Sequence, residues 1–174
     1  PPTPTPITGF PSGLSVVAFF TDGYSTFATL SDGSFWAWGQ NNNWQLWLWD
    51  TTDRLVPTQV SVIPLWTYIM DYYTNYSSSF VRWSNGQVYA WWGNWNGQLG
   101  IGNTIHPILA PTLVTGFPMW TNVIESKSLR NSDSSYALLD NGSLYTWWNN
   151  GAGELGLGTI TPPIPSPTML SGFS

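Results

Sequence analysis

The side chains that could carry acid–base or metal chemistry are few in this chain. Cysteine is absent, and His106, which precedes Pro107, is the one histidine. A metal centre of the usual kind needs several His, Cys or acidic ligands. No spacing links His106 to a serine and an aspartate as a catalytic triad requires. We therefore expect no metal, no cofactor and no enzymatic activity, and we interpret His106 as a surface loop residue.

Three acidic residues are further candidates for metal binding or acid–base catalysis. Asp50 and Asp53 form the sequence Asp-Thr-Thr-Asp, which resembles a carboxylate loop for calcium but lacks the alternating ligands and the central glycine of one. A turn held by hydrogen bonds from side chain to backbone is the favoured interpretation. Glu154 stands where related segments have Gln45 and Gln98, which indicates a structural residue rather than a general acid.

Amide and aromatic side chains alternate in two loops, 40–44 and 94–96. Amide donors beside the faces of tryptophan rings suit a sugar or a protein ligand, because such rings have an apolar body and can be joined by polar contacts. The predicted ligand contacts are Asn41, Asn43, Trp44, Asn94 and Trp95. The alternative is that the tryptophans fill the interface between neighbouring repeats.

One candidate modification site can also be read from the sequence. Asn75-Tyr76-Ser77 matches the acceptor sequence for N-glycosylation, so Asn75 is a candidate glycosylation site. The second such sequence begins at Asn141 and lies in a predicted tight hairpin, where it is less accessible.

The composition narrows the function classes. Charged residues make up 7% and aromatic residues 17% of the 174 residues, and the net charge is −5 with no basic run. Nucleic-acid binding needs a basic surface, so we expect no nucleic-acid partner. No apolar stretch is long enough for a membrane span. Few charges with many polar uncharged residues favour an extracellular or cell-surface protein.

A repeated segment organises the chain. The pairs Asp32-Gly33, Asn85-Gly86 and Asn141-Gly142 are hairpin signals that predict type I′ turns. A Pro-Thr segment also recurs, beginning at Pro4, Pro57, Pro111 and Pro167. The sequence therefore predicts one repeat array over 1–174, with repeats at 4–56, 57–110 and 111–166 and the start of the next at 167–174.

Each repeat contains four strand patterns and no helical periodicity, so we predict an all-β fold. The first strands are predicted at 16–20, 68–70 and 122–124, and the second strands at 25–30, 79–83 and 135–139. The third strands follow the glycine turns, and the fourth strands are the Pro-Thr segments. Both faces of the third strands are largely apolar, which predicts that each sheet is covered on both sides.

The residues around these turns resemble the repeat of the regulator of chromosome condensation family. The resemblance is carried by Leu138–Trp147 (Leu-Leu-Asp-Asn-Gly-Ser-Leu-Tyr-Thr-Trp), by Gly97–Gly102 (Gly-Gln-Leu-Gly-Ile-Gly) and by Trp38–Asn41 (Trp-Gly-Gln-Asn). It covers nearly the whole chain. It implies β-propeller blades of four antiparallel strands each, about three per chain, in a family that usually has seven blades to a ring.

Five tryptophans depart from the family pattern, because they stand where it has glycine: Trp44, Trp47, Trp49, Trp92 and Trp148. A glycine fixed by a fold usually supplies positive φ or a close backbone approach, and tryptophan does neither cheaply. Either these loops are rebuilt around tryptophan, or tryptophan is not the residue that the gene encodes there.

We interpret the chain as a non-enzymatic structural or assembly module, extracellular, that forms a ring or a filament by head-to-tail contact of its blades. Its expected partner is a second copy or the further repeats of a longer chain. The alternative is a protein- or glycan-binding propeller that uses its exposed Trp and Asn loops.

Overall fold

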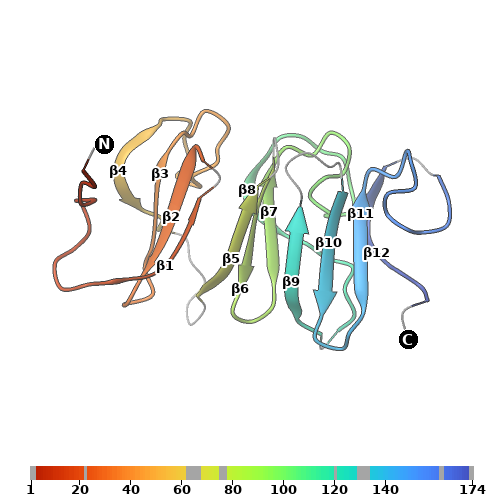
Figure 1. Cartoon of the computed structure of the whole chain (residues 1–174). Coiled ribbons are helices and arrows are strands. Elements are labelled where there is room, and N and C mark those ends of the chain that lie inside the picture. Colours follow the sequence, from red (N-terminus) through yellow and green to blue (C-terminus); the bar gives the residue numbers. More distant parts are fainter. Residues whose placement is uncertain are drawn as a thin grey trace. The chain divides into compact units, whose positions relative to one another are not determined.

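The computed structural model describes residues 3–21, 23–61, 68–74, 78–119, 121–128, 134–160 and 163–172. Within these ranges twelve strands form three separate sheets, each of four antiparallel strands, and no helix occurs (Figure 1). The predicted all-β fold with four strands per repeat is confirmed.

Each sheet follows the order of the chain. Short connections join its first three strands, and a longer loop, 40–53, 93–107 or 149–163, joins the third strand to the fourth. The first sheet contains β1 (Val16–Thr21), β2 (Ser25–Leu30), β3 (Phe35–Gly39) and β4 (Arg54–Gln59). The second contains β5 (Ile69–Thr74), β6 (Ser78–Trp83), β7 (Val88–Trp92) and β8 (Ile108–Leu113). The third contains β9 (Val123–Ser128), β10 (Ser134–Leu139), β11 (Leu144–Trp148) and β12 (Ile164–Met169).

The described chain forms two compact units. The first unit, Pro1–Trp66, holds the first sheet, and the second unit, Thr67–Ser174, holds the other two. The predicted repeat boundaries at Pro57 and Pro111 fall inside β4 and β8. The predicted second repeat, 57–110, therefore contains the second half of β4, the strands β5 to β7 and the first half of β8.

The hairpins between second and third strands differ from the predicted type I′ turns. In the first sheet Leu30 and Ser34 close a three-residue loop, and Gly33 N donates to Leu30 O at 2.9 Å. Positive φ occurs at Gly33, Gly86 and Gly142 but not at the residue before each glycine. These are type I turns followed by a left-handed glycine. The preceding Asp or Asn accepts a hydrogen bond from the backbone two residues on, as Asp32 Oδ1 does from Ser34 N at 2.9 Å, which explains why its own φ stays negative.

Strand lengths also differ from the predictions. The first strands β5 and β9 extend to Thr74 and Ser128, beyond the ranges 68–70 and 122–124 that the short apolar patterns predicted. The fourth strands begin three residues before the Pro-Thr segments, because each passes through a register shift, as between the pairs Ala90–Thr112 and Trp92–Ile108. A bulge of this kind leaves no trace in an alternating pattern.

The second and third sheets share one apolar core. Phe80, Val88 and Leu99 from the second sheet and its following loop are buried together with Leu139 and Trp147 of the third. The first unit has its own buried centre, in which the rings of Phe27 and Phe35 stack with centroids 5.5 Å apart. In the second unit the middle strands are largely buried on both faces, as predicted, whereas Trp36 and Trp38 on one face of β3 in the first unit are half-buried.

Candidate functional site

A loop after each third strand contains most of the predicted ligand contacts. It begins at Asn41 in the first sheet, at Asn94 in the second and at Asn150 in the third, and all three asparagines have 0% exposure. Their amides are used inside the loop. Asn94 Nδ2 donates to Asn103 O at 2.9 Å, and Asn94 Oδ1 accepts from Leu99 N at 3.1 Å. The same two bonds recur in the other loops.

In the first two sheets a second side chain fixes the entry to the loop. Asp53 Oδ1 accepts from Asn41 N at 2.7 Å, and His106 Nδ1 accepts from Asn94 N at 3.3 Å. His106 therefore replaces an aspartate as the acceptor for this backbone amide. Asp50 Oδ1 accepts from Thr52 N at 2.8 Å, so the predicted turn with bonds from side chain to backbone is confirmed for the Asp50–Asp53 segment.

The predicted ligand contacts fall into two groups, one in each unit. In the first unit, Asn41 is buried, Asn43 is exposed and Trp44 is half-buried. In the second unit, Asn94 is buried, whereas Trp95 is 60% exposed and its ring lies 3.4 Å from that of His106 between centroids. The exposed side chains Asn43 and Trp95 are accessible to a ligand. Asn75 lies outside the described residues.

The loop of the second sheet is a docking surface for the third. Trp147 Nε1 on β11 donates to Gln98 O at 3.0 Å. Gly102 N donates to Pro165 O at 2.8 Å. A Cβ atom added at Gly97 would lie 2.6 Å from Pro165 Cα, and one at Gly100 would lie 2.7 Å from Trp147 Nε1. The two glycines thus allow backbone and indole to approach more closely than any side chain would permit.

The connection from β8 to β9 contributes a second contact. Phe117 packs edge-on against Tyr145 and Trp147, with ring centroids 5.5 Å and 6.3 Å away. The segment before the first sheet makes the same contact, because Phe10 packs edge-on against Trp36 and Trp38 at 5.7 Å and 5.8 Å. The segment before β1 therefore packs on the first sheet as the connection from β8 to β9 packs on the third.

The corresponding surfaces at the two ends are open. In the loop of the third sheet Glu154 and Gly156 are exposed, whereas their equivalents Gln98 and Gly100 are buried. On β4 of the first sheet Leu55 is 96% and Val56 57% exposed, whereas the equivalent residues on β12 are half-buried. Each end exposes one half of the contact that joins the second and third sheets.

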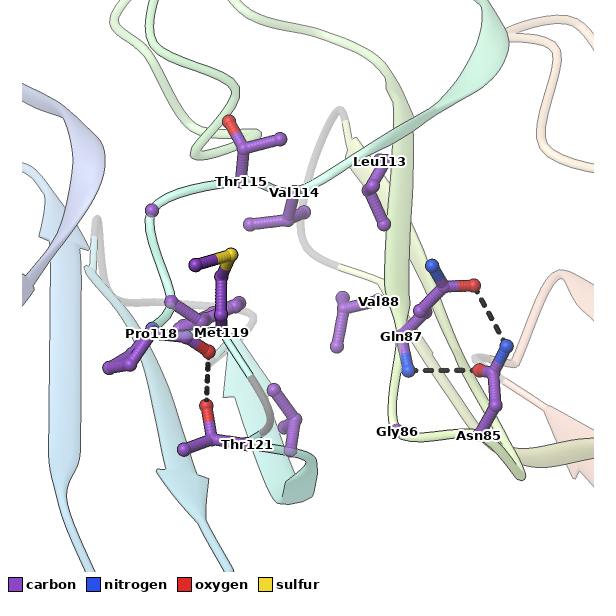
Figure 2. A pocket seen from close by; sticks show the side chains of 13 residues that line it. Asn85, Gly86, Gln87, Val88, Leu113, Val114, Thr115, Pro118, Met119 and Thr121 are labelled. Atoms are coloured by element: carbon purple, nitrogen blue, oxygen red, sulfur yellow. Dashed lines mark hydrogen bonds between the residues drawn. The ribbon is translucent and has the colours of Figure 1, made fainter.

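A pocket of roughly 360 Å³ lies in the second unit, between the hairpin at Gly86 and the segment that follows β8 (Figure 2). Its apolar lining comes from Val88, Val114, Phe117 and Met119, and Met119 is 84% exposed. Its size is at the low end for ligand pockets. Asn85, Gln87, Thr115 and Thr121 add polar side chains to the lining.

Charged residues gather on the first strands of the second unit. Asp71 on β5 lies near Arg82 on β6 and near Glu125 and Lys127 on the adjacent strand β9. Burial raises the pKa of Asp71, and the charge of Arg82 opposes that effect. Lys127 Nζ pairs with Glu125 Oε1 at 2.5 Å, which lowers the pKa of Glu125 and raises that of Lys127. Of these four groups, Lys127 and Glu125 form an ion pair.

The described residues contain neither a metal cluster nor a membrane-spanning helix. In the parts of the chain that the structure describes, no group of three or more His, Cys, Asp or Glu side chains could hold a metal ion. The same residues contain no helix long and apolar enough to cross a bilayer.

Sequence reasoning missed two features of this geometry. One is the structural role of the buried asparagines, which could have been found because Asn41, Asn94 and Asn150 occupy the same place in all three repeats. The other is the open face of β4, where Leu55 and Val56 carry no motif.

Three comparisons with known proteins agree with this arrangement. Residues 85–124 match the family model of the regulator of chromosome condensation (RCC1) repeat. The chain is 33% identical over 87 residues to human protein RCC2, a match that covers 50% of this chain and 16% of that protein.

Solved structures agree over nearly the whole chain. Human WBSCR16 matches with a TM-score of 0.73 at 22% identity, over 95% of this chain and 42% of that one. A chain in the crystal structure of Kap60 bound to yeast RCC1 (Prp20) matches with a TM-score of 0.74 at 19% identity, over 90% of this chain and 37% of that one. The chain thus spans about two fifths of the length of these structures.

Repeated four-stranded sheets that dock through a glycine loop define the chain as a section of a β-propeller, with each sheet as one blade. Residues 85–124 match the regulator of chromosome condensation (RCC1) repeat, as the sequence motifs predicted, and the solved structures share the propeller fold.

Proposed function

We propose that this chain is a non-enzymatic section of a β-propeller, completed by head-to-tail contact with further repeats of the same kind, and that the completed propeller binds proteins. The observation that carries the proposal is the complementary exposure at the two ends. The loop of the third blade exposes Glu154 and Gly156, and the first blade exposes Leu55 and Val56.

The contact between the second and third blades supplies the geometry of the proposed joint. There an indole N–H reaches a loop carbonyl, and a strand of the next blade lies on two glycines. Gly153 and Gly156 repeat that pair in the third blade, and Trp38 is the first blade's equivalent of Trp147. The third blade therefore has the loop, and the first blade the strand face, that one such joint needs.

The occupant of each open end is another RCC1-type repeat, supplied by a second copy or by a longer polypeptide. Repeats of a solenoid or propeller bury their faces against neighbours. Contacts of this head-to-tail kind close into a ring when the rotation divides the circle and otherwise form a filament.

The protein-binding part of the proposal is supported by the likeness to yeast RCC1, whose crystal structure contains bound Kap60. A glycan is the second candidate ligand, supported by the 60% exposed Trp95 stacked on His106 and by the exposed amide of Asn43. An extracellular or cell-surface location stays a proposal that rests on composition, and immunogold labelling of intact cells would test it.

The joint is tested by light scattering after size exclusion. We expect the wild-type chain to have at least twice the 19.4 kDa chain mass or to form fibres. Leu55→Asp should reduce the assembly to single chains while the sheet signal in infrared spectra remains. Ile105→Asp is the matched control, because Ile105 is 65% exposed on neither end surface, and it should leave the assembly unchanged. A folded wild-type chain at the mass of one copy would contradict self-completion.

A further inference from the structure

The backbone conformation of five tryptophans is unusual. Among the described residues, those other than glycine with positive φ are Trp44, Trp47, Trp49, Trp92 and Trp148, with φ from 55° to 92°. Glycine adopts such values freely, and asparagine and aspartate are enriched there, but a bulky residue with positive φ is a genuine outlier. No described asparagine or aspartate has positive φ, although the chain is rich in asparagine.

Each of these tryptophans aligns with a glycine of another repeat. The aligned positions are Trp44 with Gly97 and Gly153, Trp47 with Gly100 and Gly156, Trp49 with Gly102 and Gly158, and Trp92 and Trp148 with Gly39; every glycine in these sets also has positive φ. The other described tryptophans, such as Trp83 and Trp147, do not have positive φ. The described tryptophans therefore form two groups, one with positive φ at positions where other repeats have glycine and one without positive φ.

The space at these positions suits glycine as well. A Cβ atom at Gly39 would collide with the carbonyl oxygen of Tyr24. In the second repeat, Gly97 and Gly100 lie so close to Pro165 and Trp147 that a side chain would push the next blade away. The loop of each blade needs bare backbone at these points in order to dock.

We propose that glycine occupies positions 44, 47, 49, 92 and 148 in the protein as its own cell makes it, and that the codon at each position is UGA. The standard genetic code reads UGA as a stop, and variant codes read it as tryptophan or as glycine. A gene from a cell that reads UGA as glycine, translated with the tryptophan meaning, carries tryptophan at those glycines. Tryptophans encoded by UGG are unaffected, which accounts for the two populations.

This inference does not depend on the proposed function, but it changes the candidate ligand surface. With glycine at 44, 47 and 49, the loop of the first blade reads Gly-Gln-Leu-Gly-Leu-Gly and matches the loop of the second at every glycine. Trp44 is then removed from the predicted ligand contacts, whereas Trp95, which lacks positive φ, is retained.

The gene provides the first test. We expect UGA at codons 44, 47, 49, 92 and 148 and UGG at codons 83 and 147, which encode buried tryptophans without positive φ. UGG at the five positions would overturn the proposal. Mass spectrometry of the protein from its own cell should find glycine in the corresponding peptides, and tryptophan in them would overturn it equally.

A synthetic gene provides a physical test that needs no native source. The chain with all five changes, Trp44→Gly, Trp47→Gly, Trp49→Gly, Trp92→Gly and Trp148→Gly, is compared with the tryptophan chain. We expect its melting temperature to rise by on the order of 10 °C, because positive-φ strain is removed. Trp83→Gly and Trp147→Gly are the controls and should lower it, since both rings are buried and neither residue has the positive φ of the five tryptophans. A five-glycine chain that melts no higher than the tryptophan chain would overturn the proposal, and one that folds where the tryptophan chain does not would support it.

Discussion

The buried asparagine at the start of each loop shows how single residues define this fold. Asn94 satisfies three backbone or side-chain acceptors and one backbone donor, all within its own loop. Asn94 and Leu99 are both buried, so water cannot readily replace the bond from Leu99 N to the Asn94 amide. The Asn94 amide therefore helps to hold the loop backbone that docks on the next blade.

We expect Asn94→Ala to lower the free energy of unfolding by on the order of 3 kcal/mol, because it leaves buried carbonyl and N–H groups without partners. Urea denaturation followed by tryptophan fluorescence measures the change. Asn96→Ala is the control at an exposed position of the same loop, and it should stay within about 0.5 kcal/mol of wild type. Equal effects of the two variants would show that the Asn94 amide does not hold the loop.

The acidic residues give the protein two opposing pH dependences. Hydrogen bonds from Arg54, at 2.6 Å between Nη2 and Oδ2, lower the pKa of Asp50 below its ordinary value of 3.8. The folded state then binds fewer protons at this site than the unfolded state, so its stabilising effect is complete above that value and is lost as the pH falls below it. The effect of pH on stability is reversed for Asp71, because burial raises its pKa and the folded state favours the protonated carboxyl group. Its contribution to stability therefore increases as the pH falls.

Asp50→Asn should therefore reduce the loss of stability between pH 7 and pH 3, and Asp71→Asn should increase it. The measurement is the urea midpoint of each variant at the two pH values. If the two variants shifted the difference in the same direction, the environments of the two carboxyl groups would have been assigned incorrectly.

The sequence showed which residues of the loops are unusual, but it did not show what those residues do. The Asn and Trp loops were visible as motifs, but amides that bind a ligand and amides that close a loop look alike in a sequence. Burial separates them, and burial depends on residues such as Asn103 and Ile105, which accept the bonds from Asn94 nine and eleven positions further on.

Among the elements, the three hairpins have the same conformation but different surroundings. Gly86 and Gly142 have φ of 77° and 84°. A Cβ atom at Gly86 would lie 2.7 Å from Asn122 Oδ1 and 2.8 Å from Asn122 Cα, whereas one at Gly142 meets nothing within 4 Å. Gly86 O also accepts a hydrogen bond from Val123 N at 3.2 Å. The hairpin of the second blade is thus also a contact with the third.

Replacement of these glycines by alanine separates the cost of a left-handed backbone from the cost of the contact with Asn122. Gly142→Ala should destabilise by about 1 kcal/mol, the strain of a left-handed alanine. Gly86→Ala should cost at least about 2 kcal/mol, because the contact with Asn122 adds to the same strain. Thermal melts of the two single variants provide the comparison. Equal losses would mean that Asn122 moves aside freely and that the hairpin makes no firm contact with the third blade.

The number and order of strands followed from the sequence because turn glycines and alternating residues recur in each repeat. The residues at which strands begin and end could not be predicted in this way. A register shift, such as that between Ala90 and Trp92, changes where a strand pairs without changing its alternation of apolar and polar residues. The turn type was wrong for a related reason: a dipeptide such as Asn85-Gly86 suits both a two-residue and a three-residue hairpin, and the pairing of the flanking strands decides between them.

For the whole molecule, the decisive feature is that apolar faces are shared between blades. Trp147 of the third blade is completely buried and bonds to the loop of the second. The two blades of Thr67–Ser174 therefore depend on each other, whereas Pro1–Trp66 contains a single four-stranded sheet. Internal repetition predicted that blades would pack on blades, but no residue pattern predicted which blades form one unit.

Fragments that follow the two units should differ in their ability to fold. Residues 67–174 should give a cooperative thermal transition, because they retain the core shared by Leu99, Leu139 and Trp147. Residues 1–66 should not, because one sheet cannot bury both of its apolar faces, and repeats gain much of their stability from neighbours. Infrared amide I melting curves of both fragments provide the measurement. Trp147→Ala in the longer fragment should lower its midpoint more than Trp95→Ala, because Trp95 is exposed and outside this core. A cooperative transition in 1–66 alone, or its absence in 67–174, would show that blade packing does not set the folding unit.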